Sequence, residues 1–163
     1  MKTASSIRGL PNKPAIYILL SGKGQNSILY VGETDNLRRR IGQHIVKRDS
    51  SVTMEGSPVK IDPTHVEKVE WWEHSDLENP VAREAAELIA FEIFNPRVRS
   101  GANVRKDSVT MSKDAKFYGT ISSLFKGLPT GRLVIMNIES VVEKLVALEE
   151  RISKLEKKLD KQK

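Results

Sequence analysis

Five side chains with chemically useful groups follow one another along the first half of the chain. Tyr17 and Tyr30 carry phenols, Arg40 a guanidinium, His44 an imidazole and Glu87 a carboxylate. Arg40 and His44 are four residues apart, a spacing that puts them on one face of a helix. A guanidinium can bind phosphate oxygens, a carboxylate can hold a hard divalent cation, and a phenol or imidazole can hold or move a proton. The set therefore suits the hydrolysis of a phosphodiester bond, although each residue alone is more typical of packing or of an ordinary surface.

The elements that must position these residues can be predicted from the apolar runs and the breaks between them. Strands are expected over 15–20, 28–31 and 66–74, and helices over 36–47 and 80–94. Asn36 and Asn79 are typical caps, Pro80 fits a first helical turn, and Asn95-Pro96 ends the second helix. The order predicts a small α/β domain with a three-stranded antiparallel sheet flanked by helices. The pair Trp71-Trp72 puts one ring on each face of the third strand.

The remaining segments carry weaker signals. Residues 1–14 are predicted to form a polar arm, 49–65 and 97–112 to be loops, and 113–125 to hold a short helix. The longest strongly apolar stretch, 15–20, is far below the roughly 20 residues that a membrane helix needs, and a cytoplasmic protein is the default expectation. The absence of cysteine excludes disulfides, thiolate metal sites and a cysteine nucleophile.

Residues 14–104 resemble the GIY-YIG nuclease family in the order of these residues. The family's Gly-Ile-Tyr strand is similar to Ala15-Ile16-Tyr17, with alanine in place of the usual glycine, and its second strand to Tyr30-Val31-Gly32. Arg40, His44 and Glu87 follow as in the family. The stretch from Glu87 to Arg97 is similar to one in bacterial excision-repair nucleases, in which an asparagine follows; Asn103 matches it, with Ser100 or Asn95 as alternatives.

The resemblance implies a metal-dependent endonuclease that acts on DNA. It assigns catalytic roles to a set of six residues: Tyr17, Tyr30, Arg40, His44, Glu87 and Asn103. Glu87 would hold Mg²⁺ or Mn²⁺ and Arg40 would clamp the phosphate. Tyr17 would be a general base or a water orienter, with Tyr30 and His44 positioning water and phosphate, and either tyrosine could transfer the proton. A phenol has an ordinary pKa of about 10, so a basic role requires nearby cations that lower it, and the Arg-rich helix is expected to supply them. The alternative is a catalytically silent DNA-binding or oligomerisation module with the same fold; the intact set favours the enzyme.

The charge balance points to the same substrate. The chain has 27 Lys and Arg against 21 Asp and Glu, a net charge of +6, which favours polyanions such as nucleic acid. Two basic segments are expected to contact DNA phosphates outside the catalytic set, through Arg38, Arg39, Arg97, Arg99, Arg105 and Lys106. The resemblance to the nuclease family leaves restriction, repair, mobile-element and phage roles open, since all of them use this catalytic module.

The C-terminal segment has a heptad pattern typical of a coiled coil. Its apolar seam is Ile138, Val141, Leu145, Leu148, Ile152, Leu155 and Leu159. A parallel homodimer would pair Lys144 with Glu149 and Arg151 with Glu156, whereas an antiparallel one would oppose like charges. The chain is therefore expected to comprise a nuclease domain at 14–110, a connecting segment at 111–133 and a dimerising helix at 134–163, the alternative being a helix that packs on its own domain.

Overall fold

The computed structural model describes residues 1–22, 28–54, 60–98 and 104–135, together with 141–142, 145–146, 148–149 and 151–154 of the C-terminal tail. Its centre is a five-stranded sheet in the order β1-β5-β4-β2-β3. The strands are β1 (Lys2–Ala4), β2 (Ala15–Leu20), β3 (Ile28–Thr34), β4 (Lys68–Trp72) and β5 (Gly131–Val134). β1 runs parallel to β5, and all other neighbours are antiparallel.

The three predicted strands are β2, β3 and β4, so the predicted number of strands was wrong by two. β1 and β5 have three and four residues, and neither forms an apolar run that would distinguish it from a loop. β1 lies in the segment predicted as a polar arm. Both strands are added on the β4 side of the sheet, which leaves β3 as an edge strand.

The two predicted helices are confirmed, and both predicted N-caps accept hydrogen bonds from backbone amides of the first turn. α1 (Leu37–Gly42) continues as a π-helical turn, Gln43–Lys47, and the Asn36 side chain accepts a hydrogen bond from the Arg39 amide. α2 (Pro80–Phe94) is capped by Asn79 and ends at Asn95, which has a φ of 42°. α3 (Lys106–Ser112) lies in a segment predicted as a loop, so that prediction was wrong there, and α4 (Ala115–Lys126) is the predicted short helix.

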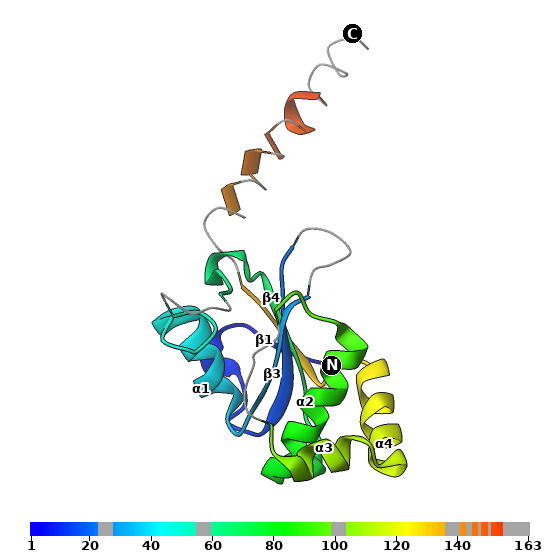
Figure 1. Cartoon of the computed structure of the whole chain (residues 1–163). Coiled ribbons are helices and arrows are strands. Elements are labelled where there is room, and N and C mark those ends of the chain that lie inside the picture. The colour runs from blue at the N-terminus through cyan, green and yellow to red at the C-terminus, as the bar shows by residue number, and fades with distance from the viewer. Residues whose placement is uncertain are drawn as a thin grey trace.

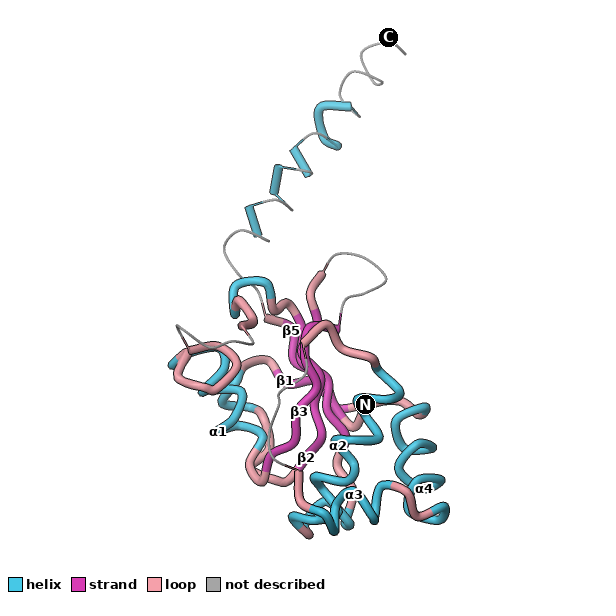
Figure 2. Tube along the Cα trace, viewed as in Figure 1, coloured by secondary structure: helices cyan, strands magenta, loops and turns pink. Residues whose placement is uncertain are grey.

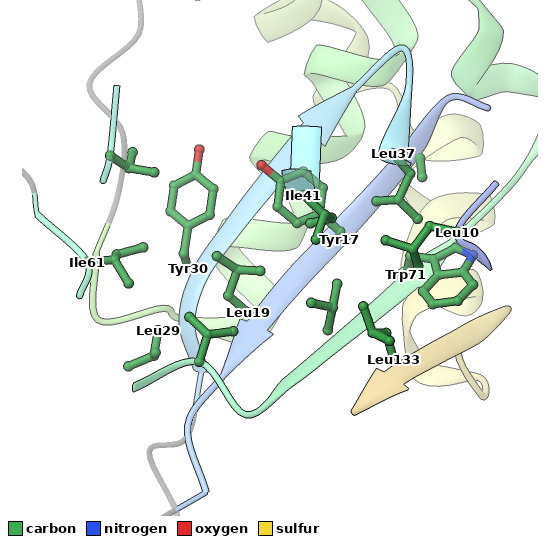
Figure 3. Packing of buried hydrophobic residues seen from close by; sticks show 14 residues of the cluster. Leu10, Tyr17, Leu19, Leu29, Tyr30, Leu37, Ile41, Ile61, Trp71 and Leu133 are labelled. Carbon is green, nitrogen blue, oxygen red and sulfur yellow. The ribbon is translucent and has the colours of Figure 1, made fainter. Parts of the chain in front are cut away.

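The helices cover both faces of the sheet, with α1 on one side and α2, α3 and α4 on the other (Figures 1 and 2). Alternation along β2 divides the core, because Tyr17 and Leu19 pack under α1 whereas Ile16 and Ile18 pack under α2. Trp71 and Trp72 are buried on opposite faces, as their adjacency predicts. Figure 3 shows the α1 side, where Tyr17 and Tyr30 stand next to each other within the apolar cluster.

The segment predicted as a connection, 111–133, contributes to this core. Ile121 and Phe125 of α4 are buried in the cluster under α2, and Leu133 of β5 is buried in the cluster under α1. The described tail residues are helical, lead away from the sheet in Figure 1 and expose their apolar side chains. Ile138, Leu155 and Leu159 of the predicted seam, and the partners Lys144 and Glu156, lie outside the described residues. The coiled coil and the domain boundaries stay predictions.

Within the described ranges, no helix combines the length and the apolar character needed to cross a membrane.

Candidate active site

A glycine on the edge strand makes room for the first tyrosine. Gly32 of β3 lies directly opposite Tyr17 of β2. A Cβ atom on Gly32 would lie 2.4 Å from the Tyr17 hydroxyl oxygen and 2.7 Å from Cε1 of Tyr30, closer than packed atoms approach. The Tyr17 phenol therefore lies over the strand where a side chain would otherwise be. Tyr30 faces the same side, with its ring centroid 6.1 Å from that of Tyr17.

α1 and the π-helical turn bring Arg40 and His44 to the two phenols. The His44 ring is fully buried, and its Nε2 is 2.6 Å from the Tyr17 hydroxyl oxygen. Its centroid is 5.7 Å from that of each tyrosine. The Arg40 guanidinium interacts with the phenols of both Tyr17 and Tyr30 through charge and hydrogen bonding. Four of the predicted residues are therefore brought together on one face of the sheet.

Glu87 reaches the same strand from the opposite face. It lies on α2 with 8% of its surface exposed, and its Oε1 accepts a hydrogen bond of 3.0 Å from the Glu33 amide, at the outer edge of β3. The Glu33 carboxylate is paired in turn with Arg83. Arg83 is buried and donates from Nη1 to the Leu77 carbonyl oxygen at 3.0 Å. Five of the six predicted catalytic residues thus lie around β3, with the phenols on one face and the carboxylate on the other.

Sequence reasoning missed the groups that support this set. His44 Nδ1 lies 2.7 Å from Ser50 Oγ, which lies 2.6 Å from Thr53 Oγ1. Both hydroxyl residues come from a segment predicted only as a loop, and common residues in a loop carry no signal. Glu33 could have been noticed, because it directly follows Gly32 on the same strand. Arg83 could not, because its spacing on α2 resembles that of an ordinary surface charge.

Burial dominates the electrostatics of the phenol and the imidazole. Burial raises the pKa of Tyr17 well above its ordinary value; Tyr30 adds to the rise, and Arg40 only partly opposes it. Arg40 thus lowers this pKa in the expected direction, but burial outweighs its effect. Burial, reinforced by Arg40, lowers the pKa of His44 to about 3. Tyr17 is thus a neutral phenol and His44 a neutral imidazole at physiological pH.

Arg40 and Glu87 are the oppositely charged groups of the site. Burial alone would lower the pKa of Arg40, but the phenols of Tyr17 and Tyr30 outweigh this effect and raise it, so the guanidinium stays charged. Burial, followed by the charge of Glu33, raises the pKa of Glu87 from 4.5 to about 7. The carboxyl group of Glu87 therefore has a pKa close to neutral pH.

The surroundings of Glu87 fit a hard divalent cation. Its ionised form is disfavoured by burial and by Glu33 and Glu84, and a cation would offset both causes. No group of three His, Cys, Asp or Glu side chains forms a metal cage within the described part of the chain. This arrangement suits Mg²⁺, which is commonly held by one or two carboxylates and keeps several waters.

The structure describes five of the remaining predicted residues. Asn103 and Arg99 fall outside the described residues. Arg38 donates from Nε to the Leu10 carbonyl oxygen at 2.8 Å, and Arg39 pairs with Asp35 at 2.5 Å, yet both remain exposed. The remaining described DNA-contact candidates are also exposed. Arg97 directly precedes Val98, which forms an isolated β-bridge with Tyr30. Arg105 is the N-cap of α3, and Lys106 is the first residue of that helix.

The segment that carries the site also matches a known protein family. Residues 13–92 match the sequence model of the GIY-YIG catalytic domain. This segment, which contains Tyr17, Tyr30, Arg40, His44 and Glu87, belongs to the GIY-YIG family, and the resemblance predicted from the motifs is confirmed. Members of this family are generally endonucleases, so the fold is of a nuclease type. No curated protein and no solved structure matches the chain.

Proposed function

We propose that this chain is a metal-dependent endonuclease that hydrolyses phosphodiester bonds of DNA. The observation that carries the proposal is the convergence of two phenols, a guanidinium, an imidazole and a carboxylate at the Gly32 edge of β3, inside the segment that matches the nuclease family. A catalytically silent module of the same fold needs none of these groups in contact with one another.

Arg40 binds the scissile phosphate in this proposal. Its guanidinium is half-buried, stays charged and interacts with both phenols. As negative charge develops on the phosphate oxygens, donors that are already oriented stabilise the transition state more than the ground state. Arg40 therefore lowers the barrier without having to reorganise.

Tyr17 and His44 act on the attacking water. The neutral phenol can accept a hydrogen bond from water while its own proton faces His44 Nε2. The water gives a proton to the Tyr17 oxygen, the phenol proton passes to Nε2, and the hydroxide attacks phosphorus as the bond to the leaving oxygen breaks. The leaving oxygen takes a proton from solvent, and His44 later releases its proton. The phosphate charge offsets Arg40, which is one of the two causes that keep His44 neutral.

Glu87 would hold Mg²⁺ or Mn²⁺ beside the outer edge of β3. When bound, the cation supplies positive charge that polarises the phosphate and the attacking water. Glu33 orients Glu87 through its backbone amide, and Arg83 keeps the Glu33 side chain in an ion pair. These two residues position the ligand and do not themselves touch the substrate.

A plasmid-nicking assay tests this proposal. The chain should convert supercoiled plasmid to open-circle or linear DNA with Mg²⁺ or Mn²⁺, and EDTA should stop the reaction. Glu87→Ala should abolish cleavage yet bind DNA as well as the unaltered chain, because it removes a negative charge. Binding without cleavage by the unaltered chain, under every metal condition, would instead identify a silent DNA-binding module.

The exposed cations outside the site are proposed as phosphate contacts. Arg38, Arg39, Arg97 and Lys106 are exposed and can reach a polyanion beside the catalytic cluster. Each contact on duplex DNA should add about 0.9 to the slope of log affinity against log salt concentration. Replacing one of them with alanine should therefore lower the slope by about 0.9. An unchanged slope would identify that residue as an ordinary solvated charge.

We further propose that the C-terminal helix forms a parallel homodimer. Leu145, Leu148 and Ile152 lie at consecutive core positions of the heptad pattern, and each exposes more than half of its surface in the single chain. A second copy would cover these side chains and place two nuclease domains at the same end of the rod.

A further inference from the structure

A buried chain of hydroxyl groups extends from His44 away from the substrate side of the site. Nδ1 of His44 is 2.7 Å from Ser50 Oγ, and Ser50 Oγ is 2.6 Å from Thr53 Oγ1. Ser50 exposes 3% and Thr53 4% of its surface. The reaction proposed above uses Nε2 of the imidazole and leaves these two hydroxyls without a role.

The backbone holds both hydroxyls in place. The amides of Thr53 and Met54 donate to the Ser50 carbonyl oxygen at 3.0 and 2.9 Å, and the Ile61 amide donates to the Val52 carbonyl oxygen at 2.8 Å. Val52 is buried in the apolar cluster that contains Tyr17. The segment after the π-helical turn is therefore a fixed support for His44.

Counting donors at Tyr17 sets the direction of the hydrogen bonds. The Arg40 guanidinium has only donors, so the Tyr17 oxygen accepts from it, and the Tyr17 hydroxyl proton must be donated elsewhere. Nε2 of His44, 2.6 Å away, is the acceptor. If Nε2 carried a proton instead, two donors would face one phenol oxygen and the phenol proton would lose this partner. The neutral imidazole therefore carries its proton on Nδ1, where Ser50 Oγ accepts it.

We propose that Ser50, supported by Thr53, is a positioning residue that fixes His44 in the tautomer whose Nε2 lone pair faces Tyr17. Ser50 can accept from Nδ1 only while its own proton points elsewhere, and Thr53 Oγ1 is in reach to accept that proton. The other tautomer already carries a proton on Nε2 and cannot take one from Tyr17. The tautomer assignment does not depend on nuclease activity; only its predicted effect on cleavage rests on the proposed function.

Imidazole NMR tests this assignment independently of activity. The chain has three histidines, and His65 and His74 lie outside the buried cluster, so His44 can be assigned by elimination with a His44→Gln variant. Long-range ¹H–¹⁵N correlation should give the Nδ1–H tautomer for His44 in the unaltered full-length chain. Ser50→Ala leaves the buried Nδ1–H donor without this acceptor, and we expect this cost to exceed the preference set by Tyr17, so His44 should shift to Nε2–H.

Thr53→Val gives the sharper comparison, because it keeps both His44 and Ser50. Without Thr53 Oγ1, the Ser50 hydroxyl turns its proton toward Nδ1, so the tautomer should again shift to Nε2–H. Ser50→Thr keeps the hydroxyl and should retain the Nδ1–H pattern. Ser122→Ala, which removes another buried serine hydroxyl on α4, should leave the His44 signals unchanged.

The same variants make a prediction for cleavage. Ser50→Ala and Thr53→Val should lower kcat by about 10- to 100-fold, the usual loss for a residue that orients another, with KM unchanged. Ser50→Thr should restore most of the activity. An Nε2–H tautomer in the unaltered chain, or an Nδ1–H tautomer that persists in Ser50→Ala, would overturn the proposal. If the chain cleaves no DNA, the tautomer decides this inference alone and the proposed nuclease activity fails separately.

Discussion

The carboxyl group of Glu87 is held where its ionised form is unfavourable, and this has a measurable cost. Its pKa rises from 4.5 to about 7, so between these values the unfolded chain has released the proton and the folded chain retains it. The free energy of unfolding must therefore fall as pH rises through this window. At about 1.4 kcal/mol per pKa unit, the loss approaches about 3 kcal/mol above pH 7.

Glu87→Gln should remove this loss, because the amide is neutral and its oxygen can still accept from Glu33. In EDTA, urea unfolding at pH 8 should show the variant more stable by about 2–3 kcal/mol, with no difference near pH 4.5. Glu92→Gln alters an exposed carboxylate on the same helix and is the matched control. Equal stability of Glu87→Gln and the unaltered chain at pH 8 would contradict the unfavourable environment of Glu87.

Arg40 should matter more for the rate than for binding. Arg40→Ala removes a transition-state donor and should lower kcat by about 10²- to 10³-fold. Arg40→Lys keeps the charge but not the planar fork, so its kcat should fall between the two. Arg132→Ala on β5, at the far side of the sheet, is a control that should keep its kcat. If Arg40→Ala raises KM alone, Arg40 belongs to binding rather than to the chemical step.

At the scale of single residues, the sequence predicts side chains through their order along the chain. Tyr17, Tyr30, Arg40, His44 and Glu87 could be selected because they occur in a family order. The sequence could not predict the sign of the pKa shift of Tyr17, because burial depends on how α1 and the following loop close over the sheet. It gave no reason to choose Ser50 over the other serines, since the contact with His44 exists only after folding.

The edge strand β3 is the element on which the site depends. Gly32→Ala would place a methyl group 2.4 Å from the hydroxyl oxygen of Tyr17, a fully buried side chain. The variant should lose about 1–3 kcal/mol of stability from overpacking. Cleavage should fall by about 10²-fold or more, because displacement of a reacting group by about 1 Å has that effect.

Gly119→Ala is the matched control, because a Cβ there meets no atom within 4 Å. Alanine in the middle of α4 should raise stability by about 0.5–1 kcal/mol without changing activity. Thermal unfolding and plasmid nicking measure both effects. A Gly32→Ala variant that is as active as the unaltered chain would show that Tyr17 does not need its place over β3.

Elements of ordinary length were predictable, and short ones were not. α2 was predicted with its observed bounds because a capping Asn-Pro pair and an Asn-Pro stop enclose an apolar periodic run. β1 and β5 were not predicted because their pairing depends on contacts between residues far apart in the sequence. β5 pairs with β4, and β1 pairs with β5. α3 was not predicted because its seven residues are mostly polar and its N-cap, Arg105, makes no side-chain capping hydrogen bond.

At the scale of the whole molecule, the described part of the C-terminal tail exposes several large apolar side chains. Leu145 exposes 56% of its surface and Val146 49%, although only Leu145 lies on the predicted seam. Leu145→Asp should therefore prevent dimerisation, whereas Val146→Asp adds the same charge off the seam and should not. Light scattering at micromolar concentration should give twice 18.3 kDa for the unaltered chain and for Val146→Asp, and 18.3 kDa for Leu145→Asp. A monomeric unaltered chain would refute the dimer.

The orientation of the two helices can be tested separately, because the chain has no cysteine of its own. In a parallel dimer the two copies of Ile152 face each other at the same core position, so Ile152→Cys should form an intermolecular disulfide in a mild oxidant. In an antiparallel dimer residue 152 faces a different position of the partner and should not be cross-linked. Ser153→Cys, one residue off the seam, should cross-link slowly in either case. A parallel result would place both nuclease domains at one end of the rod, where each could reach one strand of the same duplex, and the oxidised Ile152→Cys dimer should then cut both strands at nearby positions.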